Sequence, residues 1–346
     1  MQYQRLGATG LQVSELCLGA MMFGQWGNTD HDDSIRIIHT ALDAGINFID
    51  TADVYSAGES EEIVGKAIVG RRDDLVIATK VFGTMGDDPN RRGSSRRWII
   101  QECETSLRRL GVDYVDLYQI HRPDPETDID ETLGALSDLV HQGKIRYLGS
   151  STFPASAIVE AQWIAERRNR ERFVCEQPPY SLLVRGIEAD VLPTCERYGM
   201  GVIPWSPLAG GWLSGRWRKG AEEISSMRSS RLPDRYDLAL PQNQRKLDAT
   251  ESLAQLAEDA GMTLIHLALA FVLRHPAVTS AIIGPRTAEH LASQLGAVDV
   301  ELSDDVLDRI DAIVAPGTNF SWADAGYIPP GLEDARRRRR ETTSGR

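Results

Sequence analysis

The sequence predicts an α/β fold, a (β/α)8 barrel with an N-terminal β-hairpin and extra loops and helices. Eight short apolar runs recur along the 346 residues, separated by amphipathic stretches. The runs are continuously apolar rather than alternating, which is typical of parallel strands covered on both faces. The alternative, a doubly wound open sheet, usually carries a glycine-rich turn after its first strand, and no such turn follows here.

The predicted strands and helices alternate in chain order. The eight strands are expected at Leu16–Ala20, Ile46–Ala52, Leu75–Lys80, Tyr114–His121, Ile145–Thr152, Phe173–Gln177, Gly201–Ser206 and Ser280–Gly284. Amphipathic helices are expected at Asp32–Ala44, Ser95–Leu110, Asp130–His141, Pro154–Asn169 and Leu247–Ala260. Glycines stand where several of these helices should end, as a left-handed cap requires: Gly45, Gly111, Gly143 and Gly199.

Three segments fall outside this repeat. Tyr3–Leu6 and Leu11–Leu16 predict a hairpin before the first barrel strand. Leu208–Asn243 is too long for an ordinary βα connection, so we expect a functional lid or a disordered loop. We expect one barrel domain over residues 1–330, with a further helix after Ser303. Residues 331–346 then form a basic C-terminal tail, in which Arg336–Arg340 is a solvated run.

Composition limits the possible partners. The net charge is −12, which argues against nucleic acid or an anionic membrane as the main partner. Apolar residues make up 42% and charged residues 25% of the chain, as in ordinary globular proteins. A chain of this size and composition can bury a full core, so we expect a folded protein rather than a disordered one.

Cysteine usage and hydropathy indicate the compartment. The four cysteines show no C-x-x-C spacing, so we expect buried free thiols in a reducing environment. The N-terminus lacks the pattern of a signal peptide. The longest uncharged run, Tyr198 to Gly215, contains Pro204 and Pro207, which would interrupt a spanning helix. These features predict a soluble, cytoplasmic protein.

Polar residues follow three consecutive strands at the end of the barrel where chemistry usually sits. Asp50 ends the second strand, with Tyr55 shortly after it, Lys80 ends the third and His121 the fourth. An unpaired buried carboxylate or ammonium group is costly, and an Asp50–Lys80 pair would remove both costs. Taken singly, Asp50 could cap a turn and the other three could be ordinary rim residues. Together they favour a catalytic cluster.

Signals of other enzyme classes are weak. The chain contains no Tyr-x-x-x-Lys pair of the short-chain dehydrogenase type and no phosphate-binding P-loop. Asp30, His31, Asp32 and Asp33 could be interpreted as metal ligands, but before a helix they favour capping and dipole stabilisation. We therefore expect no catalytic metal.

The strand-end motifs together resemble those of the aldo-keto reductase superfamily. The resemblance rests on Gly45–Tyr55 with Ser60 and Glu61, on Ile77–Lys80, on Asp113–Asp124 with its His121-Arg122-Pro123-Asp124, and on Gly143–Gly149. It extends from about residue 3 to residue 315. The segment Pro204–Gly211 is similar to the branch that includes bacterial general-stress reductases and potassium-channel β subunits.

The resemblance implies a catalytic tetrad of Asp50, Tyr55, Lys80 and His121. Carbonyl reduction requires a proton at oxygen as hydride reaches carbon, and Tyr55 would be the acid. A phenol has a pKa near ~10. We expect Lys80, held by Asp50, to lower the pKa of Tyr55. His121 would hydrogen-bond and orient the substrate carbonyl.

The resemblance also implies a nicotinamide cofactor, with NADPH favoured because Arg286 could contact a 2′-phosphate. Ser151, Thr152 and Gln177 would hold the carboxamide, and Trp205 would stack on the nicotinamide ring. Thr152 replaces the usual Asn, and a hydroxyl cannot both donate and accept as an amide does. Backbone groups of Ser206, Leu208 and Gly210 would approach the pyrophosphate. The remaining cofactor contacts are expected from Gly284, Arg286, His290 and Gln294.

The sequence therefore predicts an NADPH-dependent carbonyl reductase acting on an aldehyde, a ketone or a keto-sugar. Its pocket walls are expected to include Met22, Phe23, Trp26 and Phe82. The alternative is a cofactor-binding regulatory subunit of the potassium-channel β type with weak reductase activity. A metal-dependent barrel hydrolase is a third possibility. The partner is a small-molecule carbonyl compound, and self-association into a homo-oligomer stays open.

Overall fold

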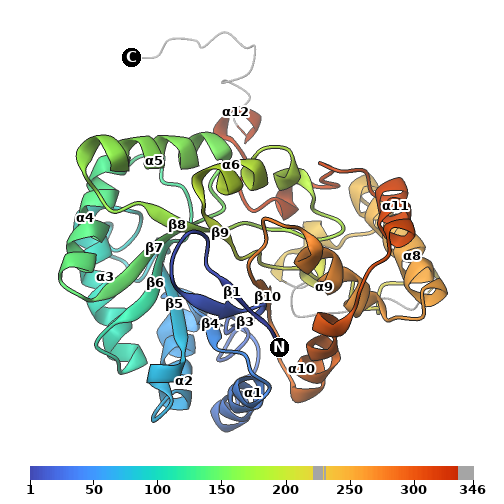
Figure 1. The fold of residues 1–346 in the computed structure, drawn as a ribbon, viewed down its shortest axis with the longest axis horizontal. Helices are drawn as coiled ribbons and strands as arrows, with labels where there is room; N and C mark the ends of the chain where they lie inside the picture. The colour runs from blue at the N-terminus through green and yellow to red at the C-terminus, as the bar shows by residue number, and fades with distance from the viewer. Residues whose placement is uncertain (221–228, 230, 334–346) are drawn as a thin grey trace.

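The computed structural model describes residues 1–220, 229 and 231–333. Eight parallel strands form one sheet in the order β10-β3-β4-β5-β6-β7-β8-β9. The sheet closes on itself, since Ile282 N donates to Pro204 O at 2.9 Å and Thr279 N donates to Val202 O at 2.8 Å. The predicted (β/α)8 barrel is confirmed, with its helices packed around the strands (Figure 1).

The barrel strands fall within or close to the predicted runs. They are β3 (Leu16–Gly19), β4 (Phe48–Asp50), β5 (Val76–Val81), β6 (Val115–Ile120), β7 (Ile145–Ser151), β8 (Phe173–Gln177), β9 (Gly201–Val202) and β10 (Ala281–Ile283). The seventh strand is shorter than predicted. Pro204 has no N–H for the ladder, and beyond it only an isolated bridge joins Trp205 to Pro179.

The five predicted amphipathic helices and the helix expected after Ser303 are present, with shifts at their ends. The helices are α1 (His31–Asp43), α2 (Glu59–Ala67), α3 (Arg96–Leu110), α4 (Ile129–His141), α5 (Ala155–Arg168), α6 (Val191–Tyr198), α8 (Pro241–Asp259), α9 (Leu264–Arg274), α10 (Ala288–Leu295), α11 (Asp304–Ile313) and α12 (Pro330–Glu333). The largest shift is at α8, which begins at Pro241 rather than Leu247. Its first turn carries proline at the first helical position, where the missing N–H costs nothing.

Helix α1 illustrates how local sequence sets these boundaries. The Asp30 carboxylate accepts a hydrogen bond from Asp33 N at 2.9 Å, so it caps the helix. Ile37, Ile38 and Ala41 are buried on one face against the barrel. The prediction that the acidic cluster before this helix serves in capping is confirmed for Asp30. Among the described residues no group of three His, Cys, Asp or Glu side chains is arranged to hold a metal ion.

The N-terminal hairpin closes the end of the barrel opposite the strand carboxyl ends. Strands β1 (Tyr3–Arg5) and β2 (Gln12–Ser14) pair antiparallel. The turn between them reaches the start of β9, where Ala8 N donates to Gly199 O at 2.8 Å. Leu6 and Val13 are fully buried and pack into the barrel interior. The open end of the barrel is therefore the one that carries Asp50, Lys80 and His121.

The long segment after β9 is ordered where it is described. The Trp212 and Trp217 rings stack at 4.2 Å between centroids, and the Tyr236 ring lies 6.0 Å from that of Trp212. Beside this stack, the buried Lys246 ammonium group lies 5.0 Å from the Trp212 ring. The expectation of a disordered loop is wrong for this part, because three buried aromatic rings give it a core of its own. Residues 221–228 and 230 lie outside the described residues.

The carboxylate of Asp324 attaches the C-terminal segment to the long segment after β9 and to α8. Asp324 accepts from Arg235 Nε at 2.7 Å and from Lys246 Nζ at 2.8 Å. Further along the segment, Gly326 lies against Trp205 and Thr152, so closely that a Cβ there would be 2.7 Å from Trp205 Cζ2. Asp324 therefore holds the segment against predicted cofactor residues. The arginine run Arg336–Arg340 lies outside the described residues.

We expect the Asp324→Ala variant to lower the free energy of unfolding by about 3–5 kcal/mol, because it leaves the buried Lys246 ammonium group without its carboxylate. Urea denaturation measures this change. Asp308→Ala, which removes an exposed carboxylate of α11, is the matched control and should shift stability by less than about 0.5 kcal/mol. Equal stability of the two variants would show that the Asp324 ion pairs are unimportant.

Two other expectations concern the whole chain. The described cysteines Cys17, Cys103, Cys175 and Cys195 are all buried and unpaired, which confirms buried free thiols. No single described helix has the length and apolar composition to cross a membrane, and the pair α8 and α9 passes that test only together, bent by 94°.

Candidate active site

A buried ion pair joins the ends of β4 and β5. Lys80 Nζ donates to Asp50 Oδ2 at 2.6 Å and to the Thr51 carbonyl at 2.8 Å, and both charged side chains are almost fully buried. Burial alone would lower the pKa of Lys80, but the negative charge of Asp50 and the Tyr55 phenol outweigh it, so the pKa lies above its ordinary value. The Lys80 side chain is therefore an ammonium group at neutral pH.

The other oxygen of Asp50 is held by two amides. Gln177 Nε2 donates to Asp50 Oδ1 at 2.8 Å, and Gln119 Nε2 donates to the same oxygen at 3.1 Å. Gln177 Nε2 also lies 3.2 Å from Gln119 Oε1. These contacts fix the carboxylate from the side opposite Lys80. Gln177, predicted to hold a cofactor amide, thus also orients Asp50.

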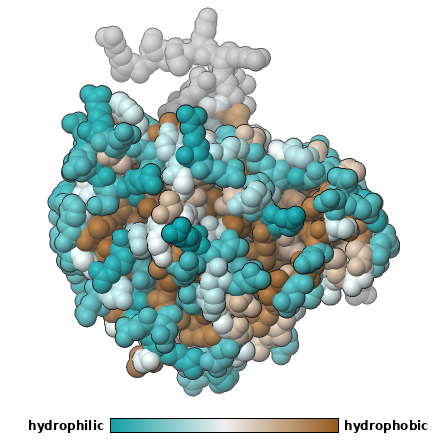
Figure 2. All heavy atoms as spheres, in the orientation of Figure 1, coloured by the Kyte–Doolittle hydropathy of each residue, from teal (hydrophilic) through white to brown (hydrophobic). Residues whose placement is uncertain are grey.

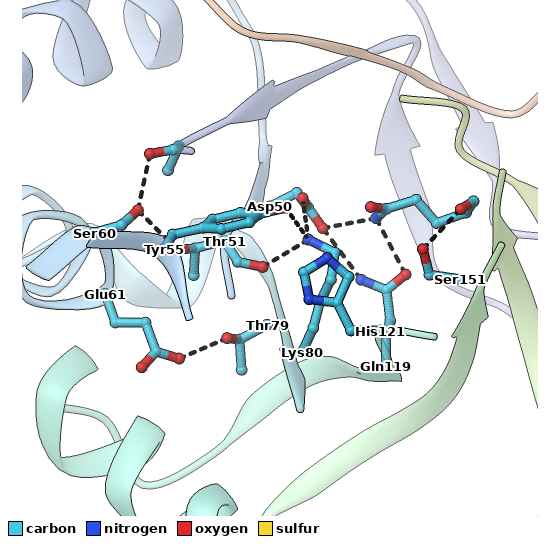
Figure 3. Close-up of polar contacts among 12 residues, drawn as sticks. Asp50, Thr51, Tyr55, Ser60, Glu61, Thr79, Lys80, Gln119, His121 and Ser151 are labelled. Carbon is cyan, nitrogen blue, oxygen red and sulfur yellow. Dashed lines mark hydrogen bonds and ion pairs between the residues drawn. The ribbon is translucent and has the colours of Figure 1, made fainter. Parts of the chain in front are cut away.

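Tyr55 reaches the same ammonium group from the loop after β4. Its hydroxyl lies 3.3 Å from Lys80 Nζ, and its side chain is 9% exposed (Figure 3). The chain leaves Tyr55 through three successive left-handed residues, Ser56 (φ 49°), Ala57 (φ 58°) and Gly58 (φ 99°). Such backbone is strained for residues other than glycine, and strain of this kind clusters at functional sites.

The pKa of Tyr55 corrects one expectation. Lys80 does favour the phenolate, but burial of the phenol outweighs it, and Asp50 adds to the rise, so the pKa lies above its ordinary value. The predicted net lowering by Lys80 is therefore wrong for the protein without substrate or cofactor. The phenol is protonated at neutral pH, as a proton donor must be.

His121 completes the cluster from the end of β6. Its ring meets the Tyr55 ring edge-on, with 5.7 Å between centroids and 79° between planes. Burial lowers the pKa of His121 well below its ordinary value, and the positive charges of Lys80 and Arg122 lower it further. The imidazole is therefore neutral at pH 7, so one ring nitrogen donates and the other accepts. Figure 3 shows His121 beside the Lys80 amine, with Tyr55 close by.

A second buried cluster supports the Tyr55 loop. Glu61 accepts from Thr79 Oγ1 at 2.6 Å and from Arg109 Nη1 at 2.9 Å, and Arg109 also binds Glu102 at 2.8 Å. A Cβ at Gly58 would lie 2.5 Å from Arg109 Nε, so only glycine fits above this arginine. The sequence motif contains Glu61 but predicts no role for it or for Arg109.

Residues predicted to bind the nicotinamide end lie together at the ends of β7 to β9. Ser151 Oγ donates to Gln177 O at 2.9 Å and lies 3.4 Å from Thr152 Oγ1. Thr152 has a left-handed backbone (φ 63°), and its amide donates to Gln177 O at 3.1 Å, whereas the Phe153 amide donates to the buried Glu176 carboxylate at 3.1 Å. Trp205 is half-buried, and its Nε1 is buried without a hydrogen-bond partner in the part of the chain that the structure describes.

The segment after β9 turns sharply at the residues predicted to meet a pyrophosphate. Ser206 has φ 60°, and its Oγ accepts from Gly210 N at 2.8 Å. Gly210 also has a left-handed backbone, and its carbonyl accepts from Tyr236 OH at 2.9 Å. Leu208 is half-buried beside them. A small cavity lies between Ser206 and Asp324, and both residues line it.

Residues predicted to bind the adenosine end gather at the start of α10. Thr287 caps this helix, accepting from His290 N at 3.3 Å. Burial lowers the pKa of His290, and the positive charges of Arg286 and Arg216 lower it further while Glu289 opposes them, so His290 is neutral at pH 7 beside the Arg286 charge. Gly284 faces open space, since a Cβ there would meet no atom within 4 Å. Gln294, unlike Gly284, does not face open space. It is 5% exposed, and its side-chain amide donates to the His290 carbonyl of its own helix.

The predicted pocket walls divide into two groups. Trp26 lies at the site, with its ring 5.9 Å from that of Tyr55 and 5.6 Å from the Arg231 guanidinium carbon. Phe82 is half-buried at the end of β5, and Met22 is 9% exposed. Phe23 is fully buried in the core between barrel and helices. Its predicted place in the pocket wall is therefore wrong in this structure, because packing covers its whole ring.

Comparisons with known proteins find similar sequences over nearly the whole chain. A model of the Aldo/keto reductase family matches residues 15–315. The "Uncharacterized oxidoreductase YrpG" of Bacillus subtilis (strain 168) is 40% identical over 329 residues, which cover 92% of this chain and 97% of the relative. A "Probable voltage-gated potassium channel subunit beta" of Arabidopsis thaliana is 38% identical over 325 residues, 91% of this chain and 97% of the relative. A rice protein of the same description is 37% identical with the same coverage.

Proposed function

Because the chain belongs to the aldo/keto reductase family, we propose that it is an NADPH-dependent carbonyl reductase acting on an aldehyde, a ketone or a keto-sugar. The observation that carries the proposal is the buried chain of contacts from Asp50 through Lys80 to the Tyr55 hydroxyl, beside a neutral His121. It combines a proton donor, a fixed positive charge and a neutral hydrogen-bonding group, which are the groups that carbonyl reduction needs.

The residues present fit a dinucleotide. The unpartnered Trp205 Nε1, the open space at Gly284 and the Arg286 charge at the start of α10 support such a site. Ser151, Thr152, Gln177 and Trp205 would hold the nicotinamide end. Ser206, Leu208 and Gly210 would meet the pyrophosphate, and Gly284, Arg286, His290 and Gln294 the adenosine end. When bound, NADPH would supply hydride to the carbonyl carbon.

The chain's own residues would handle the carbonyl oxygen. His121 would hydrogen-bond this oxygen and orient the carbonyl group. Tyr55 would donate its proton to the oxygen as negative charge develops there. The Lys80 ammonium group, 3.3 Å from the phenol oxygen, would stabilise the resulting phenolate, and Asp50 would hold Lys80 in place. A panel of carbonyl compounds, followed through NADPH absorbance, tests this function.

The pH dependence of the two reaction directions should differ. Because burial raises the pKa of Tyr55, the phenol stays protonated to above pH ~9, so the rate of reduction should be nearly constant from pH ~7 to ~9. Alcohol oxidation needs the phenolate, so its kcat/KM should rise about tenfold per pH unit over that range. The His121 imidazole should add no pH dependence between pH ~7 and ~9, because its pKa lies well below its ordinary value. Steady-state rates in both directions measure this, and a fall in reduction from pH ~7 would contradict it.

Cofactor preference should depend on Arg286. We expect Arg286→Ala to raise the Kd for NADPH about tenfold, because a charge-assisted hydrogen bond to the 2′-phosphate is lost. The Kd for NADH, which lacks that phosphate, should change little. Fluorescence titration of both cofactors measures this, and equal weakening of both would count against a 2′-phosphate contact.

A second candidate function is a cofactor-binding regulatory subunit, favoured by the relatives described as potassium channel β subunits. It would need a surface on which a partner docks. On the face drawn in Figure 2, hydrophilic residues lie between the exposed apolar residues. Slow turnover on every carbonyl tested, together with a stable complex in a pull-down, would favour this function over the reductase.

A further inference from the structure

One half-buried cation at the candidate site, Arg122, has no role in the mechanism above. Arg122 follows His121 directly, and its Nη1 donates to the His121 carbonyl at 2.6 Å and to Thr152 Oγ1 at 3.2 Å. Its guanidinium carbon lies 5.9 Å from the centre of the Trp205 ring. Arg122 thus joins the catalytic end of the site to the predicted nicotinamide end.

Arg122 differs from three other buried or half-buried arginines. Arg72 pairs with Asp116 at 2.8 Å, Arg109 with Glu61 and Glu102, and Arg185 with Glu188 and Asp311. No carboxylate of the described chain lies within 4 Å of the Arg122 guanidinium group. Both of its hydrogen-bond partners there are neutral oxygens. Charges that are largely withdrawn from water are normally paired, so this half-buried guanidinium group has unused capacity to bind an anion.

The carboxylates nearby that could neutralise Arg122 already have hydrogen-bond or ion-pair partners of their own. The carboxylate that acts on its charge is that of Glu176, which already accepts from Ser150 Oγ and from the Phe153 amide. Asp50, the acid of the catalytic cluster, is paired with Lys80. Burial lowers the pKa of Arg122, whereas the pKa of the paired Arg109 and of the paired Arg185 is raised. A bound anion would supply the charge that this position lacks.

We propose that Arg122 binds an anionic group of the substrate, a carboxylate or a phosphate, which makes the preferred substrate a carbonyl compound carrying negative charge. This inference rests on the proposed reductase function. Arg122 is adjacent to His121, so a carbonyl held by Tyr55 and His121 would place a group a few bonds away near the guanidinium. The planar guanidinium group matches either anion bidentately.

Matched substrate pairs test the proposal. We would measure kcat/KM for 4-oxobutanoate against butanal, and for glyceraldehyde 3-phosphate against glyceraldehyde, in the full-length chain with NADPH. The wild-type protein should prefer the charged member of at least one pair, and which pair shows the preference distinguishes carboxylate from phosphate. In Arg122→Gln the charged-to-neutral ratio should fall about 10–100-fold, the effect of losing a charged hydrogen bond. The charged-to-neutral ratio of kcat/KM should fall less in Arg122→Lys than in Arg122→Gln.

Arg172→Gln is the control, since Arg172 is exposed and lies outside the candidate site, just before β8. The charged-to-neutral ratio of kcat/KM in Arg172→Gln should equal that of the wild type. A binding measurement accompanies the kinetics: succinate and inorganic phosphate are titrated against the NADP⁺ complex by tryptophan fluorescence. The Kd of the preferred anion should rise about tenfold in Arg122→Gln.

The outcomes separate this inference from the proposed function. If no aldehyde is reduced, charged or neutral, the reductase function itself fails. If neutral aldehydes are reduced and charged ones are not preferred, the anion site is wrong. If Arg122→Gln weakens both members of a pair equally, Arg122 only braces the His121 and Thr152 strand ends, and the proposal is overturned. A raised Kd for NADPH with an unchanged ratio would assign Arg122 to the cofactor and also overturn it.

Discussion

The Tyr55→Phe variant should lose carbonyl reduction by about 10²–10⁴-fold in kcat, the range expected for removing a general acid. Only the hydroxyl changes, and that oxygen lies 3.3 Å from Lys80 Nζ while the ring packs beside Trp26 and His121. The fold and the ring contacts should therefore survive. Single-turnover oxidation of bound NADPH measures the loss without interference from product release.

Two controls belong to this variant. The Kd for NADPH should stay within about threefold of the wild type, because none of the residues expected to hold the cofactor is altered. Tyr3 lies in the hairpin, at the end of the barrel opposite the cluster. Tyr3→Phe removes its exposed phenol hydroxyl, which donates to Gly45 O at 2.9 Å, and should leave kcat unchanged. Near-normal reduction by Tyr55→Phe would remove the acid from the proposed mechanism.

Lys80→Met should damage both stability and activity. It leaves the Asp50 carboxylate buried without its cation, which should cost about 3–5 kcal/mol in the free energy of unfolding. It also removes the charge that would stabilise the Tyr55 phenolate, so kcat/KM should fall by about 10²-fold or more. Urea denaturation and steady-state rates on one aldehyde measure the two effects.

A double variant separates these effects. In Asp50→Asn with Lys80→Met the buried site is neutral, and the carbonyl oxygen of the introduced side-chain amide could still accept the Gln119 and Gln177 amides that bind Asp50 Oδ1. Most of the lost stability should return, while activity should not. Lys144→Met, which breaks the partly exposed pair with Glu104, is the control and should leave activity intact. Recovery of activity in the double variant would show that Lys80 serves stability alone.

The sequence predicts the barrel well because its strands are buried on both faces. The run Leu75–Lys80 has the length and continuous apolar character of a covered parallel strand, and β5 occupies Val76–Val81. Burial likewise makes Asp50 and Lys80 conspicuous, since each charge ends an apolar run. Their pairing at 2.6 Å follows from the adjacency of β4 and β5. The prediction of Tyr55 and His121 rests on their positions after strand ends and on the resemblance.

Other features depend on contacts between distant segments, which spacing along the chain does not encode. Gln119 is a single amide inside the apolar run of β6, and only the register of β6 with β5 and β7 brings it to Asp50. The net rise of the Tyr55 pKa depends on how completely the phenol is buried, which no local pattern gives. Arg122 is visible in the sequence as part of a motif, but its lack of a carboxylate partner among the described residues emerges only in three dimensions.

The four side chains of the cluster, Tyr55, Lys80, Asp50 and His121, should act on one carbonyl oxygen beside a bound nicotinamide. A crystal structure of the chain with NADP⁺ and an unreactive carbonyl analogue tests this most directly. We predict that the analogue's oxygen lies about 3 Å from both the Tyr55 hydroxyl and a His121 ring nitrogen, with the nicotinamide against Trp205. An analogue bound elsewhere, or a dinucleotide seated away from these four side chains, would contradict it.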